Sequence, residues 1–591
     1  MQSRIRVENP IPMPHATHGA PPRAKPVLVC VLEEIEPDIL KRMIPPECIP
    51  MLLAVSRSVR DGLRGLPAHV HARADERLRP MPVLLRSCVV RQMIVRRQRL
   101  KHSEALVLAD ILAQCSKLQH LELRLDALNE SAAQVLWLAV KHCCSLESFA
   151  LECMHTTSVG KTLLLTACRD LENLARLNLH GLKIGTEGAQ TLATCLHKSG
   201  RLRHLDLGKN YVNDEGLAAL ASRLWANTSL QHLDLQENRL TEQGMRVLAV
   251  ATQLTYLDVS TNELGNEGAA ELGNSLDQMP YLAHLQAANV LMDERGITEL
   301  MTRMGKCNAL QSLNLQCSSL LMQAAQTLAR GLLGCTALTH LNLQDTLLDN
   351  AALGVIAEKL AACTGLLHLD LSGNYITGAG VMHIEHAAAR WTRLQELDLD
   401  YNKIDGTGAK HLAGVFAQCR QLAVVNVQAN RLKAHGIGAL EAALAAAQLL
   451  RVLDLGGTKM LDAGVHVLAR CLPRCPALHH LDVSYNGITA RAAASLGTIL
   501  SGCTGLQQLH VENNKVGAPG ASALAAALAG STKLLHLKLE HNYLGDAGAC
   551  ALLNALAFNT SLRTMNLARN GVCDHVTRNL AELHAARVRI A

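Results

Sequence analysis

Aromatic side chains are scarce in this sequence, which has only 3 Trp, 7 Tyr and 3 Phe among 591 residues although 49% of its residues are hydrophobic. A globular enzyme of this size fills its core with more rings. The bias toward Leu, Ala, Val and Ile therefore predicts a small repeated unit rather than several different cores. Catalytic motifs are also missing, because there is no G-x-S-x-G, no H-E-x-x-H and no intact G-x-G-x-x-G. We expect no enzyme and no cofactor.

Long apolar runs are absent too. None reaches the ~18–20 residues that span a bilayer, so we expect no membrane span. The Pro-rich N-terminus lacks the apolar stretch and cleavage site of a secretory signal. The 19 cysteines are odd in number and spread over the chain. These features predict a soluble, cytoplasmic protein in a reducing compartment, and leave cytoskeletal or axonemal association open.

What the sequence does contain is a repeat, L-x-x-L-x-L-x-x-N-x-L-x-x-x-G. It is plain in LRHLDLGKNYVNDEG at 202–216 and LLHLDLSGNYITGAG at 366–380. The spacing is 28 residues except for one interval of 24, and a degenerate earlier copy begins at Val90. The 17 starts, each counted as position 1, are Leu118, Leu146, Leu174, Leu202, Leu230, Leu254, Leu282, Leu310, Leu338, Leu366, Leu394, Leu422, Leu450, Leu478, Leu506, Leu534 and Leu562.

The physics of one unit follows from its positions. Positions 4 and 6 alternate as a strand does, so both side chains face inward. The Asn at position 9 can satisfy backbone groups in the following turn, including those of the next coil. Position 15 is Gly, and the apolar spacing after it is helical. One strand and one helix cannot bury their own faces, so neighbouring units must stack.

The unit resembles the leucine-rich repeat, and its uniform length is similar to the ribonuclease-inhibitor-like class. The resemblance covers residues 118 to about 590. It implies an α/β horseshoe solenoid of about 17–18 repeats, with a parallel concave sheet and convex helices, over 90–591 including a C-terminal capping helix. Such solenoids bind partners on the concave face, so we expect a protein-interaction scaffold.

The same class includes the repeats of the Ran GTPase-activating protein and of NOD-like receptors. A GTPase activator is one alternative, although the chain shows no acidic C-terminal tail and no obvious match to that family's catalytic loop. Immune sensing is disfavoured, because no nucleotide-binding domain precedes the repeats.

One stretch, HTTSVGKTLL at 155–164, ends like a phosphate-binding loop. The motif requires Gly where His155 stands. Gly160 is in phase with the repeat glycines, and Lys161 is expected to be the first exposed residue of a convex helix. The repeat therefore accounts for the match.

Departures from the repeat are informative. Position 9 is not Asn in the first three repeats (Asp126, Met154 and Leu182), nor in a middle group (Val290, Ser318 and Thr346). We predict local softness over 285–350, unless water or backbone shifts compensate. The 24-residue repeat should lack about one helical turn. Cysteines three residues before a repeat start are expected to be buried thiols, at Cys115, Cys143, Cys307, Cys335, Cys363, Cys419, Cys475 and Cys503.

Histidine recurs at position 3 and Asp at position 5, so both project to one face. The pairs recur along the sheet instead of converging, and strand spacing of ~4.8 Å spreads them into columns, so we expect a polar surface and no metal or catalytic site. Tyrosines flanked by acids suit a basic or mixed partner surface. The candidate partner-binding residues are Asp370, Asp398, Asp400, Tyr401, His480, Asp482, Tyr485, Glu512 and Glu540.

The N-terminal part departs from the repeat. Residues 1–26 are predicted to be a disordered Pro-rich tail, and 27–89 a helical cap. Within the cap, residues 34–63 resemble a degenerate F-box, which would make the chain a substrate receptor that binds a ubiquitin-ligase adaptor. The match is carried by Pro37, Ile39, Leu40, Val55, Ser56, Arg57 and Arg60, and Pro45, Pro46 and Pro50 interrupt its second helix. A basic cluster at 86–101 lacks aromatic stacking partners, so nucleic acid is not expected.

Overall fold

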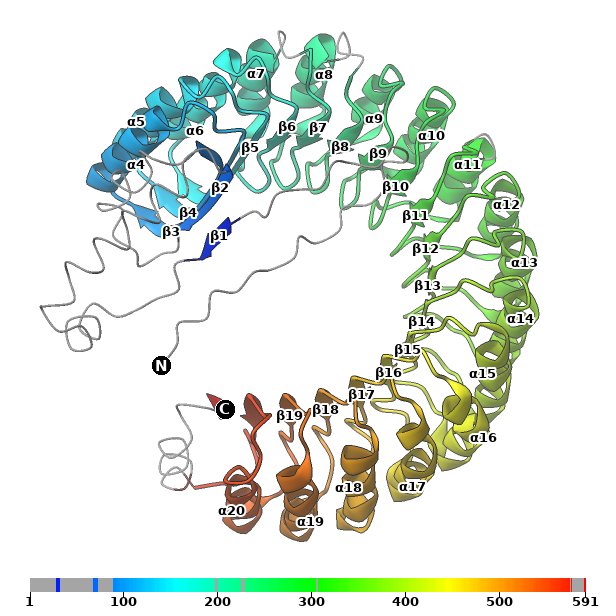
Figure 1. Cartoon of the computed structure of the whole chain (residues 1–591). Helices are drawn as coiled ribbons and strands as arrows, with labels where there is room; N and C mark the ends of the chain where they lie inside the picture. Colours follow the sequence, from blue (N-terminus) through cyan, green and yellow to red (C-terminus); the bar gives the residue numbers. More distant parts are fainter. Residues whose placement is uncertain are drawn as a thin grey trace, which may run out of the picture. The chain divides into compact units, whose positions relative to one another are not determined.

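The computed structural model describes residues 28–31, 67–72, 89–196, 200–224, 229–304, 307–573, 576 and 589–590. The chain divides into two compact units, Met1–Glu263 (unit 1) and Leu264–Ala591 (unit 2), and each is described by itself. Strands and helices alternate along the described repeats from β3 to β20, in the order predicted (Figure 1). Both are therefore solenoids of stacked strand–helix repeats.

Unit 1 has long strands first and short strands later. Its strands are β1 (Leu28–Val31), β2 (Pro67–Ala72), β3 (Val89–Leu100), β4 (His120–Leu128), β5 (Ser148–Thr156), β6 (Arg176–Asn178), β7 (His204–Asp206), β8 (His232–Asp234) and β9 (Tyr256–Asp258). Its helices are α4 (His102–Gln114), α5 (Glu130–Lys141), α6 (Ser158–Ala167), α7 (Gly185–Leu196), α8 (Asn213–Leu224) and α9 (Glu242–Leu248), with the 3-10 turn η2 (Cys168–Asp170).

Unit 2 repeats one pattern throughout. Its strands are β10 (His284–Gln286), β11 (Ser312–Asn314), β12 (His340–Asn342), β13 (His368–Asp370), β14 (Glu396–Asp398), β15 (Val424–Asn426), β16 (Val452–Asp454), β17 (His480–Asp482), β18 (Gln508–His510), β19 (His536–Lys538), β20 (Thr564–Asn566) and β21 (Arg589–Ile590). Its helices are α10 (Gly265–Leu276), α11 (Glu294–Met304), α12 (Met322–Leu332), α13 (Asn350–Leu360), α14 (Gly378–Ala388), α15 (Gly406–Gln418), α16 (Lys433–Ala446), α17 (Leu461–Cys471), α18 (Ala493–Gly502), α19 (Gly517–Gly530) and α20 (Gly545–Ala555), with the 3-10 turns η3 (Leu472–Arg474) and η4 (Ala490–Ala492).

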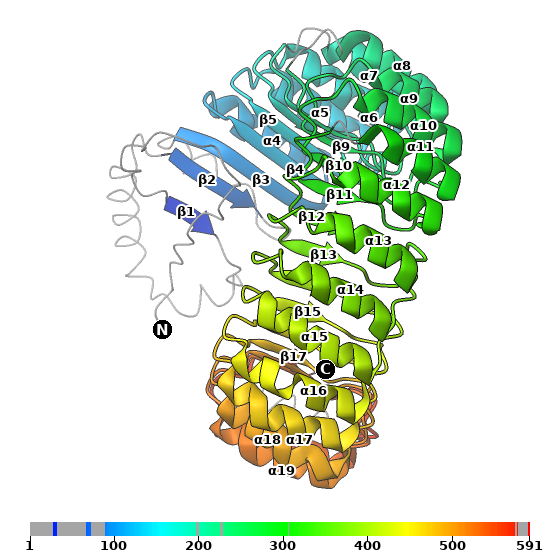
Figure 2. The ribbon, with the colours of Figure 1, turned by 90° about the vertical axis from the view of Figure 1, so that its right-hand side faces the viewer.

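The strands of each unit form a parallel sheet in which equal repeat positions are paired. Leu397 at position 4 of β14, for example, faces Leu369 of β13 and Val425 of β15. The position 4 and 6 side chains are buried between the sheet and the helices, which lie on one side of it (Figure 2). Positions 3, 5 and 7 consequently project from the other side of the sheet.

Buried asparagines at position 9 form a hydrogen-bonded ladder. The Asn238 side-chain amide donates to the carbonyls of Leu207, Leu235 and Gln236 at 2.8–3.0 Å, and its oxygen accepts the N–H groups of Asn210 and Val212 at 3.2 and 3.0 Å. The contacts between repeats reach back to the preceding coil, not forward to the next one as expected. Each asparagine therefore closes its own turn and holds the turn before it.

Where position 9 is not asparagine, the hydrogen bonds made by the replacing residue differ from repeat to repeat. Thr346 and Thr458 each donate a hydroxyl to the carbonyl three residues earlier, at 2.7 and 2.8 Å, so Thr performs part of the role as expected. Ser318 is 3% exposed, and its hydroxyl has no hydrogen-bond partner. The strands β10, β11 and β12 keep three residues each. The softness predicted for 285–350 stays a prediction.

Several other predictions concern the outer layer. The eight phased cysteines are all buried and free, as expected. In the 24-residue repeat α9 has 7 residues, against 12 in α8, which confirms the missing turn.

In the stretch that resembles a phosphate loop, the Gly160 N–H donates to Thr157 Oγ1 at 3.1 Å, and Lys161 Nζ donates to the Lys183 carbonyl at 2.7 Å. Lys161 is half-buried and is not the first exposed residue of α6.

The N-terminal part adds strands to the sheet. In the range predicted as a helical cap, Leu28–Val31 and Pro67–Ala72 are strands, β1 pairing parallel with β2 and β2 with β3. The degenerate repeat at Val90 is present, with Val90, Met93 and Val95 buried in β3. The F-box-like segment 34–63, the tail 1–26 and nearly all of the predicted closing helix lie outside the described residues.

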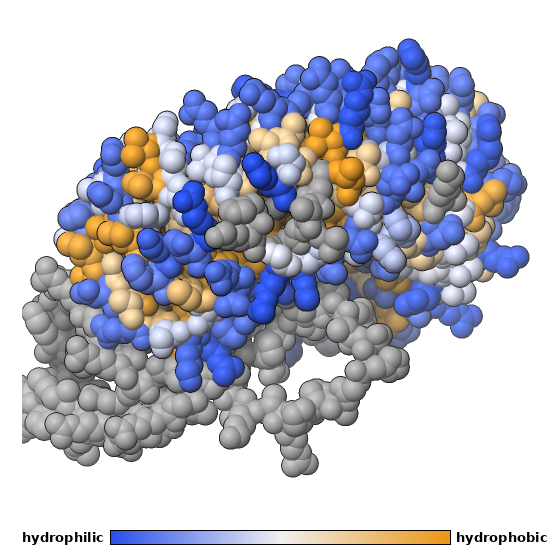
Figure 3. Space-filling model, turned by 90° about the horizontal axis from the view of Figure 1, so that it is seen from above, coloured by the Kyte–Doolittle hydropathy of each residue, from blue (hydrophilic) through white to orange (hydrophobic). Residues whose placement is uncertain are grey.

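The face drawn in Figure 3 is largely hydrophilic, and its hydrophobic residues form small separate patches. Apolar residues scattered in this way are normal on protein surfaces. No helix within the described ranges is long and apolar enough to cross a membrane.

Candidate functional site

The strand side of unit 2 carries a column of acids across neighbouring repeats. Asp370 of β13 is the register partner of Asp398 of β14, and Asp454 of β16 is the partner of Asp482 of β17. Carboxylates follow at position 7 in three repeats. We call this set the acidic strand face: Asp370, Asp398, Asp400, Asp454, Asp482, Glu512 and Glu540.

Burial and mutual repulsion perturb these carboxyls. Burial, reinforced by the neighbouring Asp482, raises the pKa of Asp454 to about 7. Burial and the Asp398 charge raise the pKa of Asp400 to about 6. The pKa values of Asp398 and Glu512 are also raised, mainly by burial. Opposed like charges are unfavourable in a sheet, so this face holds its negative charge at a cost in stability.

Three carboxylates of the face have an oxygen without a hydrogen-bond donor. Asp400 Oδ1, Glu512 Oε2 and Glu540 Oε2 are buried atoms with no hydrogen-bond partner. The other oxygen of Glu512 lies 3.6 Å from Lys538 Nζ, and Glu540 accepts a hydrogen bond from Asn566. A buried acceptor without a donor costs ~1–3 kcal/mol. A donor supplied from outside the chain would remove that cost.

The candidate tyrosines stand at the edge of this face. Tyr401 and Tyr485 are both at position 8 and both 65% exposed, with φ values of 49° and 55°. A left-handed backbone is unfavourable for a bulky residue. Other repeats have Gly373 and Gly457 at the same position. The tyrosines therefore occupy a turn position that glycine suits better, with their rings exposed.

The nine candidate residues fall into two groups. Asp482, Tyr485, Glu512 and Glu540 line one groove of about 510 Å³, and His480 lies on the same strand as Asp482. Asp370, Asp398, Asp400 and Tyr401 belong to β13, β14 and the turn after β14, and do not line that groove. The structure thus brings five candidates together and places the other four on neighbouring repeats.

A histidine–aspartate cluster lies at one end of the groove. Asp482 of β17 is paired in register with His510 of β18, and a ligand atom from each of His480, Asp482 and His510 lies within 4.8 Å of the others. Burial alone would raise the pKa of Asp482, but hydrogen bonds from His510 and Ser484 outweigh it and lower that pKa. The pKa of His480 is lowered, chiefly by burial. The expectation that the His–Asp pairs do not converge is therefore wrong at this point.

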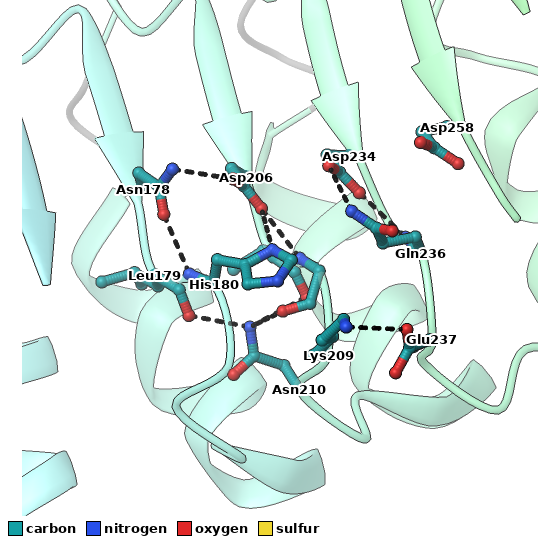
Figure 4. A network of polar contacts seen from close by, with 12 residues as sticks. Asn178, Leu179, His180, Asp206, Lys209, Asn210, Asp234, Gln236, Glu237 and Asp258 are labelled. Carbon is teal, nitrogen blue, oxygen red and sulfur yellow. Dashed lines mark hydrogen bonds and ion pairs between the residues drawn. The ribbon is translucent and has the colours of Figure 1, made fainter. Parts of the chain in front are cut away.

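Unit 1 has a related network, shown in Figure 4. Asp206 Oδ2 accepts Asn178 Nδ2 at 2.7 Å, and Asp206 Oδ1 lies 3.4 Å from His180 Nδ1. Asp234 accepts both the backbone and the side-chain N–H of Gln236, at 2.9 and 3.2 Å. Burial raises the pKa of Asp234 to about 6. Both oxygens of Asp206 and both oxygens of Asp234 already have a hydrogen-bond donor.

The repeats match a known sequence family. The model described as Leucine Rich repeat matches residues 202–221, 226–249, 251–273, 362–384, 392–413, 474–497, 502–525 and 530–553. Eight segments of the chain are therefore leucine-rich repeats. Each matched segment begins at, or shortly before, one of the repeat starts found in the sequence.

Solved leucine-rich repeat structures are similar at low identity. A protein of Leptospira interrogans is 19% identical over 72% of this chain and 97% of its own, with a TM-score of 0.44. An internalin of Listeria monocytogenes is 18% identical over 65% and 86%, with a TM-score of 0.38. TLR13, solved in complex with ssRNA13, is 17% identical over 89% and 78%, with a TM-score of 0.43. No curated protein matches the chain.

Sequence reasoning placed His541 among the exposed strand positions of this surface but missed three other basic groups, His510, Lys538 and Arg569. His510 and Lys538 stand at position 5, where the two preceding repeats have Asp454 and Asp482. His541 and Arg569 stand at position 8. All four line the groove, and Arg569 lies 3.2 Å from His541. The signal was available, because the repeat phase alone places His510 beside Asp482.

Proposed function

We propose that this leucine-rich repeat protein is a non-enzymatic interaction scaffold whose acidic strand face binds a basic segment of a protein partner. The observation that carries the proposal is the set of three buried carboxylate oxygens without donors, on Asp400, Glu512 and Glu540. Lys and Arg side chains from a partner would supply charge-assisted hydrogen bonds to such oxygens. The perturbed carboxyls would then regain their ordinary ionisation on binding.

The exposed tyrosines supply the apolar part of the proposed interface. Interface anchors are enriched in Tyr, which offers a large rigid ring and a polar tip. Tyr401 and Tyr485 are both 65% exposed; Tyr401 follows Asp400 in the chain, and Tyr485 lines the groove with Asp482 and Glu512. An extended segment that alternates basic and apolar residues fits this pattern. The stacked repeats also support the proposal, because repeat solenoids present extended surfaces on which partners bind.

Binding of designed peptides to the purified full chain tests the proposal. A fluorescent peptide alternating Arg or Lys with Leu should bind, a Glu-containing counterpart should not, and added salt should weaken the complex. The triple variant Asp400→Arg/Tyr401→Ala/Tyr485→Ala should reduce affinity at least tenfold. Tyr281→Ala is the matched control, because Tyr281 is 57% exposed but lies outside the strand positions.

Two results would refute the proposal. One is equal binding of the basic and acidic peptides. The other is equal loss of affinity in the triple variant and in the Tyr281 control. If the basic peptide behaves as expected, photo-crosslinking from position 401 or 485 in an extract then identifies the natural partner.

A further inference from the structure

The cluster of His480, Asp482 and His510 has the separations of a metal site. His510 Nδ1 lies 3.3 Å from Asp482 Oδ2. Two ligands bound ~2.0–2.1 Å from one tetrahedral ion lie about 3.3 Å apart, so an ion can replace the hydrogen bond between them without moving either group. A ring nitrogen of His480 is within 4.8 Å of both. A small rotation of that ring would complete three ligands.

Neighbouring side chains orient the three groups for this role. Gln508 Oε1 contacts His480 Nδ1 at 3.0 Å, which leaves the other ring nitrogen open. Asp482 Oδ1 accepts both the N–H and the hydroxyl of Ser484, at 2.7 and 2.5 Å. This leaves Oδ2 directed at His510. Metal-binding histidines and carboxylates are held by outer hydrogen bonds of this kind.

The surroundings leave a fourth position accessible. Asp482 is 8% exposed, whereas the groove lined by Asp482 and His510 is open and measures about 510 Å³. A partly dry carboxylate facing an open groove suits an ion with three protein ligands and one exchangeable ligand. Lys538, the register partner of His510, lies 3.6 Å from Glu512 Oε1, which offsets its positive charge.

The unit 1 network is a useful contrast. Its one histidine and two aspartates also lie within 4.8 Å of one another. There, however, both oxygens of Asp206 and both oxygens of Asp234 accept hydrogen bonds from Asn178, Gly208 and Gln236. An ion would have to displace these donors. Only the unit 2 cluster combines two imidazoles with a carboxylate oxygen that has a single contact, among the residues that the structure describes.

We propose that His480, Asp482 and His510 bind a Zn²⁺ ion, with its fourth position open to the groove. Two imidazoles and a carboxylate with one open position match the preference of Zn²⁺. Gln508 is a positioning residue for His480. The site does not depend on the proposed partner, because it is formed by this chain alone.

Metal titration of the purified, reduced, metal-free full chain tests this site. Added Co²⁺ should give the intense visible bands of a four-coordinate ion, at one ion per chain, and Zn²⁺ should displace it. X-ray absorption of the Zn²⁺ form should show nitrogen and oxygen neighbours without sulfur. His510→Gln and Asp482→Asn should abolish the bands, and Gln508→Ala should weaken affinity about 10–100-fold.

Two histidine variants serve as matched controls. His180→Gln alters the unit 1 network, and His536→Gln alters a position 3 histidine whose Nδ1 lies 2.8 Å from Thr564 Oγ1. Both should keep full Co²⁺ binding, and circular dichroism should show all variants folded. The proposal is overturned by bands that persist in His510→Gln, by loss of binding in His180→Gln alone, by a thiolate charge-transfer band, or by failure of the wild type to bind.

Discussion

Two regions of the chain lack the buried asparagine, and they replace it in different ways. In unit 1, β4 and β5 run on for 9 residues each, and position 8 is a buried Leu125 or Cys153. In unit 2, β10 and β11 stop after 3 residues, and position 8 is an exposed Asn289 or Cys317 with a left-handed backbone. An apolar position 8 continues the inward alternation of positions 4 and 6, so position 8 decides between strand and turn.

The largest effect we expect is a difference in stability. Removing the position 9 side chain should cost far more in a repeat that has asparagine there than in one that does not. Asn486 is 1% exposed; its amide donates to the Leu455 and Ser484 carbonyls, and its oxygen accepts the Met460 N–H. Asn486→Ala would leave these buried groups unpaired and lower the free energy of unfolding by about 4 kcal/mol. Met154→Ala, at the same repeat position but 62% exposed, should change it by less than about 0.5 kcal/mol. Urea denaturation measures both.

A similar loss for Asn486→Ala and Met154→Ala would mean that position 9 contributes through general packing. Hydrogen exchange would locate the effect. With the ladder broken, protection should fall in β16, β17 and the turns after them, and remain in β13 and β14.

The second prediction exchanges the two kinds of position 8. Leu125→Asn would place an amide inside the continuous strand β4, and burial of an unpaired amide should cost about 3 kcal/mol. Cys317→Asn places the same amide in an exposed left-handed turn, which Asn tolerates well, and should cost less than about 0.5 kcal/mol. Thermal and urea unfolding of the two variants make the comparison.

If Leu125→Asn were as stable as wild type, the strand would have converted to a turn. Position 8 would then be sufficient to set the local structure, and a shorter β4 would show as lost amide protection over residues 124–128.

The third prediction concerns charge, in which strand β4 of unit 1 and strand β16 of unit 2 differ. At β4 the position 5 acid, Glu122, lies 2.5 Å from Arg124, whereas Asp454 of β16 faces Asp482. The pKa of Asp454 is raised to about 7 from ~3.9 in an unfolded chain. The folded state thus holds the proton more tightly, so stability is full below about pH 4 and falls as pH rises to about 7. Asp454→Asn should raise the free energy of unfolding at pH 8 by about 1–2 kcal/mol and leave it unchanged at pH 4.

Asp405 is the control for this pH profile. Hydrogen bonds from Thr407 and Gly408 at the start of α15 lower its pKa, so its contribution has the opposite sign and is lost as pH falls. A pH profile of Asp454→Asn that parallels that of wild type would show that the carboxyl is not perturbed.

The sequence predicted the fold in detail because a single repeat period determines which residues pair between strands and which positions face the core. Positions 4 and 6 alternate, so Leu397 had to face Leu369, and an asparagine at position 9 had to lie in the turn after the strand. It also predicted the columns of acids, since equal positions pair across parallel strands. It did not predict β1 and β2, which lie outside the period, nor the convergence of His480, Asp482 and His510. That cluster depends on β18 having His510 at position 5 beside Asp482 of β17, and on side-chain rotamers that no repeat pattern specifies.

The smallest effect we expect concerns the middle repeats, which have no asparagine at position 9. Ser318 is 3% exposed at position 9, and its hydroxyl has no partner, whereas Thr346 in the next repeat donates to Leu343 at 2.7 Å. Removing an unpaired buried hydroxyl avoids its desolvation cost, so Ser318→Ala should raise the free energy of unfolding by up to about 1 kcal/mol. Thr346→Val deletes a bonded hydroxyl and should lower it by about 1 kcal/mol. Opposite signs for the two variants in matched urea titrations would show that the middle repeats hold their turns through backbone contacts and Thr. Equal losses would show instead that Ser318 is satisfied by bound water.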